Sequence, residues 1–298
     1  MARLLAFAGA IVISFSAILV RLADVSPSTA AFFRPAYGLP FLLVATLAFR
    51  PATGRTARER WLAVGAGGLM GVAFTLWNHA IVAIGAGLST VLGNTQVVFV
   101  GLAAWLLFGE RPTRWAMVAV PVVFLGAMAT SGLGGGAAYG DAPARGVAFG
   151  LLNGVSYAAF LLIFRRIGRG RRVAAGPLAD ATFGAALVTL AAGLTTDPAF
   201  DLRFAWPEHG WLLLTGLGPQ TVGWLMIFYA LPRLPALETS VALLLQPVLT
   251  VAWAWLLLAE TPSAVQLGGV GLVLAGVALL SVLGSARRPR GAAAGRPA

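Results

Sequence analysis

Residues 104–112 read Ala-Trp-Leu-Leu-Phe-Gly-Glu-Arg-Pro, and residues 254–262 read Ala-Trp-Leu-Leu-Leu-Ala-Glu-Thr-Pro. A shift of 150 positions relates the two segments and aligns 69–112 with 219–262 without a gap. Apolar bias explains matched Val, Leu and Ala, but not Gln, Trp, Glu and Pro matched in one register. These matches are Gln96/Gln246, Trp105/Trp255, Glu110/Glu260 and Pro112/Pro262. The chain therefore contains an internal repeat.

Composition places both halves of the repeat in a membrane. Of the 298 residues, 59% are hydrophobic and 10% are charged, whereas soluble domains have roughly 45 to 50% apolar and about 25% charged residues. A transmembrane helix needs about 20 apolar residues, so ten helices leave no room for a separate soluble domain. We predict an all-α integral membrane protein with ten spans, at residues 4–20, 28–49, 61–84, 88–108, 115–133, 146–164, 174–196, 210–231, 237–258 and 264–284.

The arginines predict the orientation of these spans. The chain has 21 Arg and no Lys, and cytoplasmic loops carry the excess of basic residues. With the N-terminus inside, 17 of the 21 fall in cytoplasmic loops or tails, most densely from Arg165 to Arg172. We therefore expect both termini to be cytoplasmic. We interpret the net charge of +11 as topogenic and not as a nucleic-acid interface.

Five spans per half is an odd number, so the second half enters the membrane in the opposite sense to the first. Inverted repeats of this kind are typical of transporters that alternate access to a site near the midplane. We expect a first repeat at 1–133, a Gly-rich external linker at 134–145, a second repeat at 146–285 and a disordered cytoplasmic tail at 286–298.

Two five-span halves, each with a fourth span that closes on a Glu, resemble the EamA branch of the drug/metabolite transporter superfamily. Within it, the chain is similar to the YddG-type exporters of aromatic amino acids, which implies a bacterial inner-membrane exporter of amino acids or other metabolites. The family often has a Pro in the fourth span of each half. Here Pro247 follows Gln246, but Val97 follows Gln96, so we expect any helix break to be stronger in the second half.

Polar side chains inside the spans are the candidate binding groups, since such residues are costly and mark either a functional site or a hydrogen bond between helices. Gln96 and Gln246 are related by the repeat, and at 1.5 Å per residue both fall near the bilayer centre. Asn78 and His79 share one face of the third span. His79 is the one imidazole well inside a predicted span, which makes it the candidate for proton handling.

Spans six and eight mix aromatic rings with polar groups on one face, through Tyr157 and Phe160 and through Trp224 and Phe228. Such a face either packs against lipid and other helices or lines a cavity for a partly apolar ligand. Arg34, about two turns into span two, either snorkels to the interface or anchors a substrate carboxylate. The predicted substrate-binding residues are Arg34, Asn78, His79, Gln96, Tyr157, Trp224 and Gln246; no catalytic or metal-binding residue is expected.

Two further expectations concern packing. The glutamates at the edges of the membrane predict capping or pairing in the loops, and glycines inside two spans predict close approach of helices. The residues concerned are Glu110, Glu260, Gly67, Gly71, Gly268 and Gly271.

The motifs favour a secondary transporter over an enzyme. The sequence has no Gly-x-x-x-x-Gly-Lys nucleotide loop and no Gly-x-Ser-x-Gly elbow. With no Cys and two His, it excludes zinc-thiolate, iron-sulfur and multi-imidazole centres. We expect no cofactor.

A single Arg within the spans disfavours phosphorylated solutes, and the lack of a carboxylate at any span centre disfavours lipophilic cations. We predict export of neutral, aromatic or large apolar amino acids or similar metabolites by alternating access. The alternatives are an exporter of drugs or other small metabolites and an integral-membrane enzyme. The expected partners are the small-molecule substrate and the lipid bilayer, with no nucleic acid, and the chain is expected to be a monomer or a homodimer.

Overall fold

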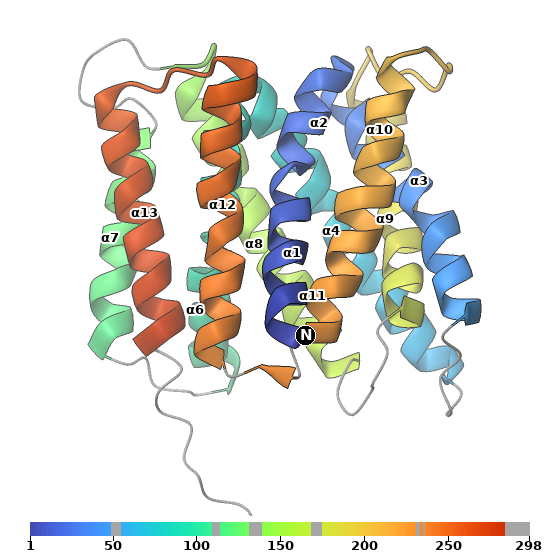
Figure 1. Ribbon diagram of the computed structural model, residues 1–298, viewed down its shortest axis with the longest axis horizontal. Coiled ribbons are helices and arrows are strands. Elements are labelled where there is room, and N and C mark those ends of the chain that lie inside the picture. Colours follow the sequence, from blue (N-terminus) through green and yellow to red (C-terminus); the bar gives the residue numbers. More distant parts are fainter. Residues whose placement is uncertain are drawn as a thin grey trace, which may run out of the picture.

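The computed structural model describes residues 1–48, 55–108, 114–130, 139–167, 175–230, 233–234 and 236–283. Its principal elements run side by side in one helical bundle (Figure 1). They are α1 (Ala2–Ser14), α2 (Ser16–Ala23), α3 (Pro27–Ala48), α4 (Ala57–Ile84), α5 (Ala86–Gly93), α6 (Gln96–Phe108), α7 (Arg114–Thr130), α8 (Pro143–Ile167), α9 (Ala175–Thr196), α10 (Glu208–Leu217), the π-helix η1 (Gly218–Gly223), α11 (Trp224–Ala230), α12 (Ala236–Leu258) and α13 (Ala264–Leu283).

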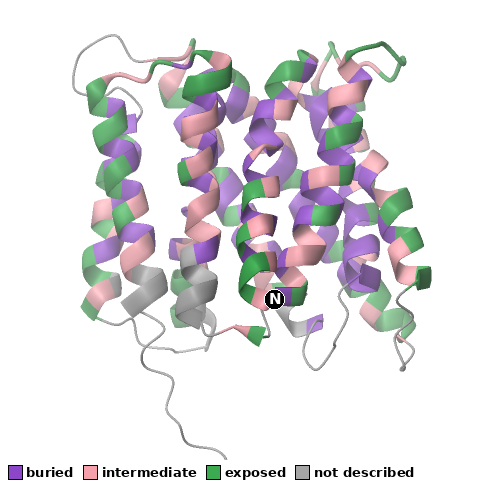
Figure 2. Cartoon of the chain, viewed as in Figure 1, coloured by how far each residue is buried: buried purple, intermediate pink, exposed green. Residues whose placement is uncertain are grey.

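These elements form ten rods, because α1 continues into α2, α5 into α6, and α10 through η1 into α11 (Figure 1). Within the described residues, seven rods are long and apolar enough to cross a membrane, and shorter apolar helices lie in α7, α12 and α13. The predicted all-α membrane fold is confirmed. Figure 2 shows exposed residues along the rods and at their ends. Large hydrophobic side chains such as Leu43, Val44 and Leu187 are exposed, as expected for a surface that faces lipid.

The chain begins on one face of the bundle, and α13 ends on the same face, at the bottom of Figure 1. We call this the terminal face; the far face carries the end of α2, the segment 197–207 and the start of α13. Residues 134–138 of the expected linker 134–145 and all of the expected tail 286–298 lie outside the described residues, so these two boundaries remain predictions.

Packing between helices repeats as the sequence does. The third rod of the first half, α4, packs against α8 and α9, which begin the second half. Its counterpart, the rod α10–η1–α11, packs against α1, α2 and α3, which begin the first half. The remaining contacts include two pairs of counterparts, α3 with α9 and α7 with α13. Each half therefore inserts its third span between the first two spans of the other, as expected for an inverted repeat.

The crossing of α4 and α9 depends on glycine. A Cβ atom added to Gly67 would lie 1.9 Å from the carbonyl oxygen of Ala181, and one added to Gly71 would lie 2.8 Å from that of Ala185. The two glycines predicted to allow close packing in α4 are thus confirmed. Without side chains at these positions, the two backbones can touch.

The same prediction for α13 was wrong. A Cβ atom added to Gly268 or Gly271 would meet nothing within 4 Å. The contact is made instead by Gly269, where an added Cβ would lie 2.6 Å from the carbonyl oxygen of Gly126 in α7. Successive residues of a helix face different directions. The sequence alone did not show which of the glycines at 268, 269 and 271 faces α7.

The fourth span of each half also departs from expectation. The helix α12 continues through Pro247, whereas its counterpart breaks between α5 and α6. At this break the Asn94 Nδ2 group donates to the Thr90 carbonyl at 2.8 Å, and the Thr95 hydroxyl donates to the Leu92 carbonyl at 2.6 Å. Short polar side chains that bond to their own backbone compete with the helix, so these residues, and not the proline, determine where the span is interrupted.

Candidate functional site

Arg34 lies between the helices of the bundle. It follows the start of α3 by seven residues, which corresponds to a depth of about 10 Å from the far face. Its side chain is 5% exposed. The Nε group donates to Oε1 of Gln220 at 3.0 Å, and Nη1 donates to the Ser16 hydroxyl at 2.9 Å. The snorkelling alternative is therefore wrong, because the guanidinium points into the protein.

The guanidinium is also held by aromatic rings of α4. It lies 4.2 Å from the centroid of the Phe74 ring and 5.4 Å from that of Trp77, which are cation–π distances. In the part of the chain that the structure describes, Arg34 has no carboxylate within ion-pair distance, and its ionisable neighbour is Tyr157. Asp180 pairs with Arg55.

Both hydrogen-bond partners of Arg34 lie at irregular points of their helices. Ser16 begins α2, directly after the break at Phe15. Gln220 lies in the π-helix η1, is fully buried, and donates from Nε2 to the Thr182 hydroxyl of α9 at 3.2 Å. π-Helical turns occur often at functional sites. We refer to Ser16, Arg34, Thr182 and Gln220 as the Arg34 network; it joins the two halves of the repeat.

Gln220 was not among the binding residues predicted from the sequence, although it lies in the eighth span, one helical turn before Trp224. The signal that was available is Gly218-Pro219 immediately before it. A Pro inside a span removes a backbone donor and disturbs the regular helix, which is how Gln220 comes to lie in a π-turn.

A cluster of five rings lies beside Arg34. In α8 the rings of Tyr157 and Phe160 have centroids 5.4 Å apart, and in α11 those of Trp224 and Phe228 are 5.2 Å apart. The two helices meet where the centroids of Tyr157 and Trp224 are 6.2 Å apart, and Phe164 packs against Phe228 at 5.4 Å. The four aromatic residues named in the sequence analysis thus pack together. With Phe164 they form what we call the aromatic cluster: Tyr157, Phe160, Phe164, Trp224 and Phe228.

The aromatic cluster and the Arg34 network are adjacent. Phe74, whose ring lies under the guanidinium, belongs to the same apolar core as Tyr157, Phe160 and Trp224. The indole Nε1 of Trp224 is buried without a hydrogen-bond acceptor among the described residues. A cation, an unpaired donor and a set of rings therefore lie together inside the membrane-spanning region.

The two predicted residues of span three face different ways. Asn78 is 1% exposed and donates from Nδ2 to the Phe74 carbonyl at 2.8 Å, while its Oδ1 has no donor in the described part of the chain. His79 is half-buried beside the exposed Val82, and its ring lies 5.5 Å from that of Phe149 in α8. Asn78 therefore lies one turn from Phe74 and the guanidinium, whereas His79 contacts α8 at the edge of the bundle.

The paired glutamines are not joined to the Arg34 network by a hydrogen bond. Gln96 is the first residue of α6, directly after the break, and Gln246 lies within α12. Both are half-buried, and across the described ranges neither side-chain amide makes a hydrogen bond. The structure therefore does not bring these two amides to Arg34.

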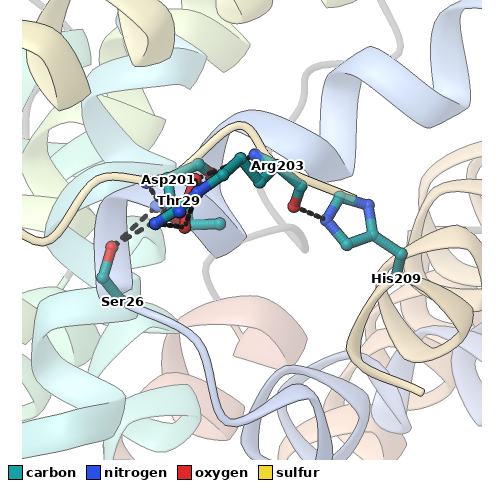
Figure 3. Close-up of polar contacts among 5 residues, drawn as sticks. All are labelled: Ser26, Thr29, Asp201, Arg203 and His209. Carbon is teal, nitrogen blue, oxygen red and sulfur yellow. Dashed lines mark hydrogen bonds and ion pairs between the residues drawn. The ribbon is translucent and has the colours of Figure 1, made fainter. Parts of the chain in front are cut away.

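On the far face, the segment 197–207 is tied to the start of α3. The Asp197 carboxylate accepts from the Ser28 amide at 3.3 Å, and the Thr29 hydroxyl accepts from the Asp201 amide at 3.0 Å. Figure 3 shows that Thr29 also contacts Ser26, while Asp201 pairs with Arg203. The second half therefore caps a helix of the first.

Figure 3 also shows His209, the first residue after Glu208 in α10, bonded to the Arg203 carbonyl at 3.0 Å. Because a carbonyl only accepts, Nε2 must carry the proton. In the neutral ring, Nδ1 then accepts from the Tyr37 hydroxyl, 2.5 Å away. This imidazole fastens the segment 197–207 to α3 and α10, on the far-face side of Arg34.

Glu260 caps the short helix α5. Its carboxylate accepts from the amides of Ala86 at 2.6 Å and Gly87 at 3.1 Å, and the residue is 1% exposed. Burial raises the pKa of Glu260, and these two hydrogen bonds and the charge of Arg21 act in the opposite direction. The capping role expected for Glu260 is confirmed, while Glu110 lies outside the described residues.

Comparison with known proteins agrees with this architecture. The EamA-like transporter family model matches residues 1–132 and again 144–282, one match for each half of the repeat. A solved crystal structure is similar in fold, with a TM-score of 0.64 over 95% of this chain and 96% of the other, at 17% sequence identity. No curated protein sequence matches the chain.

Proposed function

Because the chain belongs to the EamA-like transporter family, we propose that it is a secondary transporter that exports neutral amino acids with aromatic or large apolar side chains. In this proposal it works by alternating access in the bacterial inner membrane, with both termini in the cytoplasm. The inverted packing of the two halves supports alternating access, since each half can rock against the other around a shared site.

The observation that carries the proposed substrate is the position of Arg34 beside the aromatic cluster. A guanidinium has five N–H donors, and the hydrogen bonds to Ser16 and Gln220 use two of them. The remaining donors suit a carboxylate, which arginine binds bidentately. The rings of Tyr157 and Trp224 offer an apolar wall for the side chain of the same solute.

The other predicted residues take secondary places in this proposal. The free Oδ1 of Asn78, close to Phe74, can accept from an ammonium group. Gln96 and Gln246 line the path of the solute and are not its anchors. His79 couples transport to protons in this proposal through its contact with Phe149 of α8, because protonation of the His79 ring would change how α4 packs against α8.

An exporter of drugs or other small metabolites is the competing function. Such a carrier would not need a buried guanidinium with unused donors, so Arg34 favours a carboxylate-bearing solute. An integral-membrane enzyme is disfavoured, because the family consists of transporters.

Flux into proteoliposomes tests the proposal. The purified chain should move L-phenylalanine, L-tryptophan and L-leucine saturably, without chemical change, and should not move L-lysine or glucose 6-phosphate. Transport of organic cations or sugar phosphates but of no amino acid would contradict the substrate class. Release of a new chemical product would contradict transport itself.

A further inference from the structure

We infer that the Arg34 site selects solutes with one net negative charge. Its preferred ligand is an apolar monocarboxylate, and a zwitterionic amino acid is a weaker ligand of the same site. The inference rests on the proposed function and goes beyond it, because it assigns to the same site a second class of solute that carries a net charge.

The first argument is the lack of a compensating charge. None of the nine acidic residues that the structure describes falls in the middle of a rod. Glu59, Asp180 and Glu238 lie within the first six residues of α4, α9 and α12, and the others lie in or beside the loops of the far face: Asp24, Asp141, Asp197, Asp201, Glu208 and Glu260. Asp180, Asp197, Asp201 and Glu260 already have other partners. Glu208, whose Oε2 is buried without a partner among the described residues, is the first residue of α10 at the far face and makes no ion pair with Arg34. Arg34 thus brings an unbalanced positive charge into the bundle.

The second argument is the energy of burying that charge. An ion in a low-dielectric interior is strongly disfavoured unless it is paired. Phe74, Trp77, Ser16 and Gln220 stabilise the guanidinium through polar and cation–π contacts but do not neutralise it. A bound carboxylate neutralises it. A solute that adds a single negative charge therefore leaves the occupied site electrically balanced.

The third argument concerns the ammonium group of an amino acid. On binding, the ammonium loses its water and needs up to three acceptors. Among the described residues close to the site, the buried acceptor without a partner is Oδ1 of Asn78, a neutral amide. The other unpartnered group beside the aromatic cluster is a donor, Nε1 of Trp224, which cannot help an ammonium. The same donor can add to the binding of a carboxylate or carbonyl oxygen.

A matched series of three ligands tests the inference on the unmodified full chain. The ligands are 3-phenylpropionate, L-phenylalanine and 2-phenylethylamine, which share a ring and differ in charge. We expect calorimetry at pH 7.5 to show 3-phenylpropionate binding about five- to 150-fold more tightly than L-phenylalanine, the cost of leaving an ammonium under-satisfied. We expect no measurable binding of 2-phenylethylamine.

The outcomes separate the inference from the proposed function. If L-phenylalanine binds as tightly as 3-phenylpropionate or more tightly, the charge preference is overturned and the amino-acid exporter stands. If neither carboxylate binds, the proposed function fails and the inference fails with it.

Variants at two positions show whether Arg34 is the source of the preference. Arg34→Lys keeps the charge, so it should keep the preference with weaker binding, whereas Arg34→Gln should abolish it. Gln220→Glu places a carboxylate against Nε of Arg34 and should remove the preference by neutralising the cation internally. Each variant is first checked for an unchanged elution volume and thermal transition. A preference for 3-phenylpropionate that persists in well-folded Arg34→Gln would overturn the assignment.

Discussion

The Nε group of Arg34, in the first half of the repeat, donates to Oε1 of Gln220, in the second half, at 3.0 Å. This hydrogen bond crosses the boundary between the two halves, along which they would move in the proposed alternating access. It fixes one edge of the guanidinium, and Nη2 makes no hydrogen bond within the described chain. In our proposal, Gln220 is therefore a positioning residue for the carboxylate site.

We predict that Gln220→Leu weakens binding of L-phenylalanine and of 3-phenylpropionate alike. The guanidinium loses an acceptor and its orientation, at about 1 to 3 kcal/mol, or roughly five- to 150-fold in affinity. Calorimetry measures both constants. Equal affinities in the variant and the unmodified protein would show that Gln220 does not orient Arg34.

Replacement of Gly67 should separate α4 from α9. In Gly67→Ala the new Cβ would lie 1.9 Å from the Ala181 carbonyl oxygen, so the backbones must move apart. Gly65→Ala, two residues away in the same helix, meets nothing within 4 Å and serves as the control. We expect thermal unfolding in detergent to show a lower midpoint for Gly67→Ala. For Gly65→Ala we expect no loss, because Ala is the better helix former by up to about 1 kcal/mol.

Removal of the α5 cap should destabilise the protein. In Glu260→Ala the amides of Ala86 and Gly87 lose their acceptor inside the protein, which costs about 1 to 3 kcal/mol. Glu260→Gln retains a side-chain oxygen and should lose less. Chemical unfolding in detergent compares the free energy of unfolding of the three proteins. Equal values would show that the Glu260 cap does not stabilise the protein.

The same carboxyl predicts a pH dependence. Burial holds the pKa of Glu260 above its ordinary value of 4.5, so folding takes up a proton at this group just above pH 4.5. The stability of the unmodified protein should therefore fall, relative to Glu260→Gln, as pH rises through the raised pKa. A difference in unfolding midpoint that stays constant between pH 4 and 8 would contradict this.

The orientation of the bundle can be tested directly because the chain has no Cys. Ala205 lies in the exposed segment 197–207 on the far face, and Ala57 is exposed at the start of α4 on the terminal face. In intact cells, an impermeant maleimide should label Ala205→Cys, and Ala57→Cys only after permeabilisation. The reverse pattern, or labelling of both variants in intact cells, would refute cytoplasmic termini.

The fold followed from the sequence because its determinants are local and repeated. Long apolar stretches, charged loops and a register of 150 residues specify ten spans and their relation by inversion. Side-chain direction was harder to predict. Gly268 and Gly269 are neighbours, yet only Gly269 faces α7, and His79 and Asn78 differ in the same way because about 100° separates successive residues of a helix.

The helix breaks were the second obstacle. We expected a helix break at Pro247 because proline interrupts helices. The break that the structure shows follows Gly93, where the side chains of Asn94 and Thr95 bond to the nearby backbone. Gln220 was not recognised as the partner of Arg34 because its position depends on the π-turn η1, which has no strong sequence signature beyond Gly218-Pro219.

The measurement that tests the central claim most directly is counterflow of radiolabelled L-phenylalanine in proteoliposomes, with the unmodified protein, Arg34→Lys and Arg34→Gln reconstituted at equal density. If Arg34 anchors the carboxylate of the transported solute, the unmodified protein should show saturable exchange. Arg34→Lys should exchange with a raised KM, and Arg34→Gln should show only the background of empty vesicles. Exchange by Arg34→Gln with an unchanged KM would contradict the account.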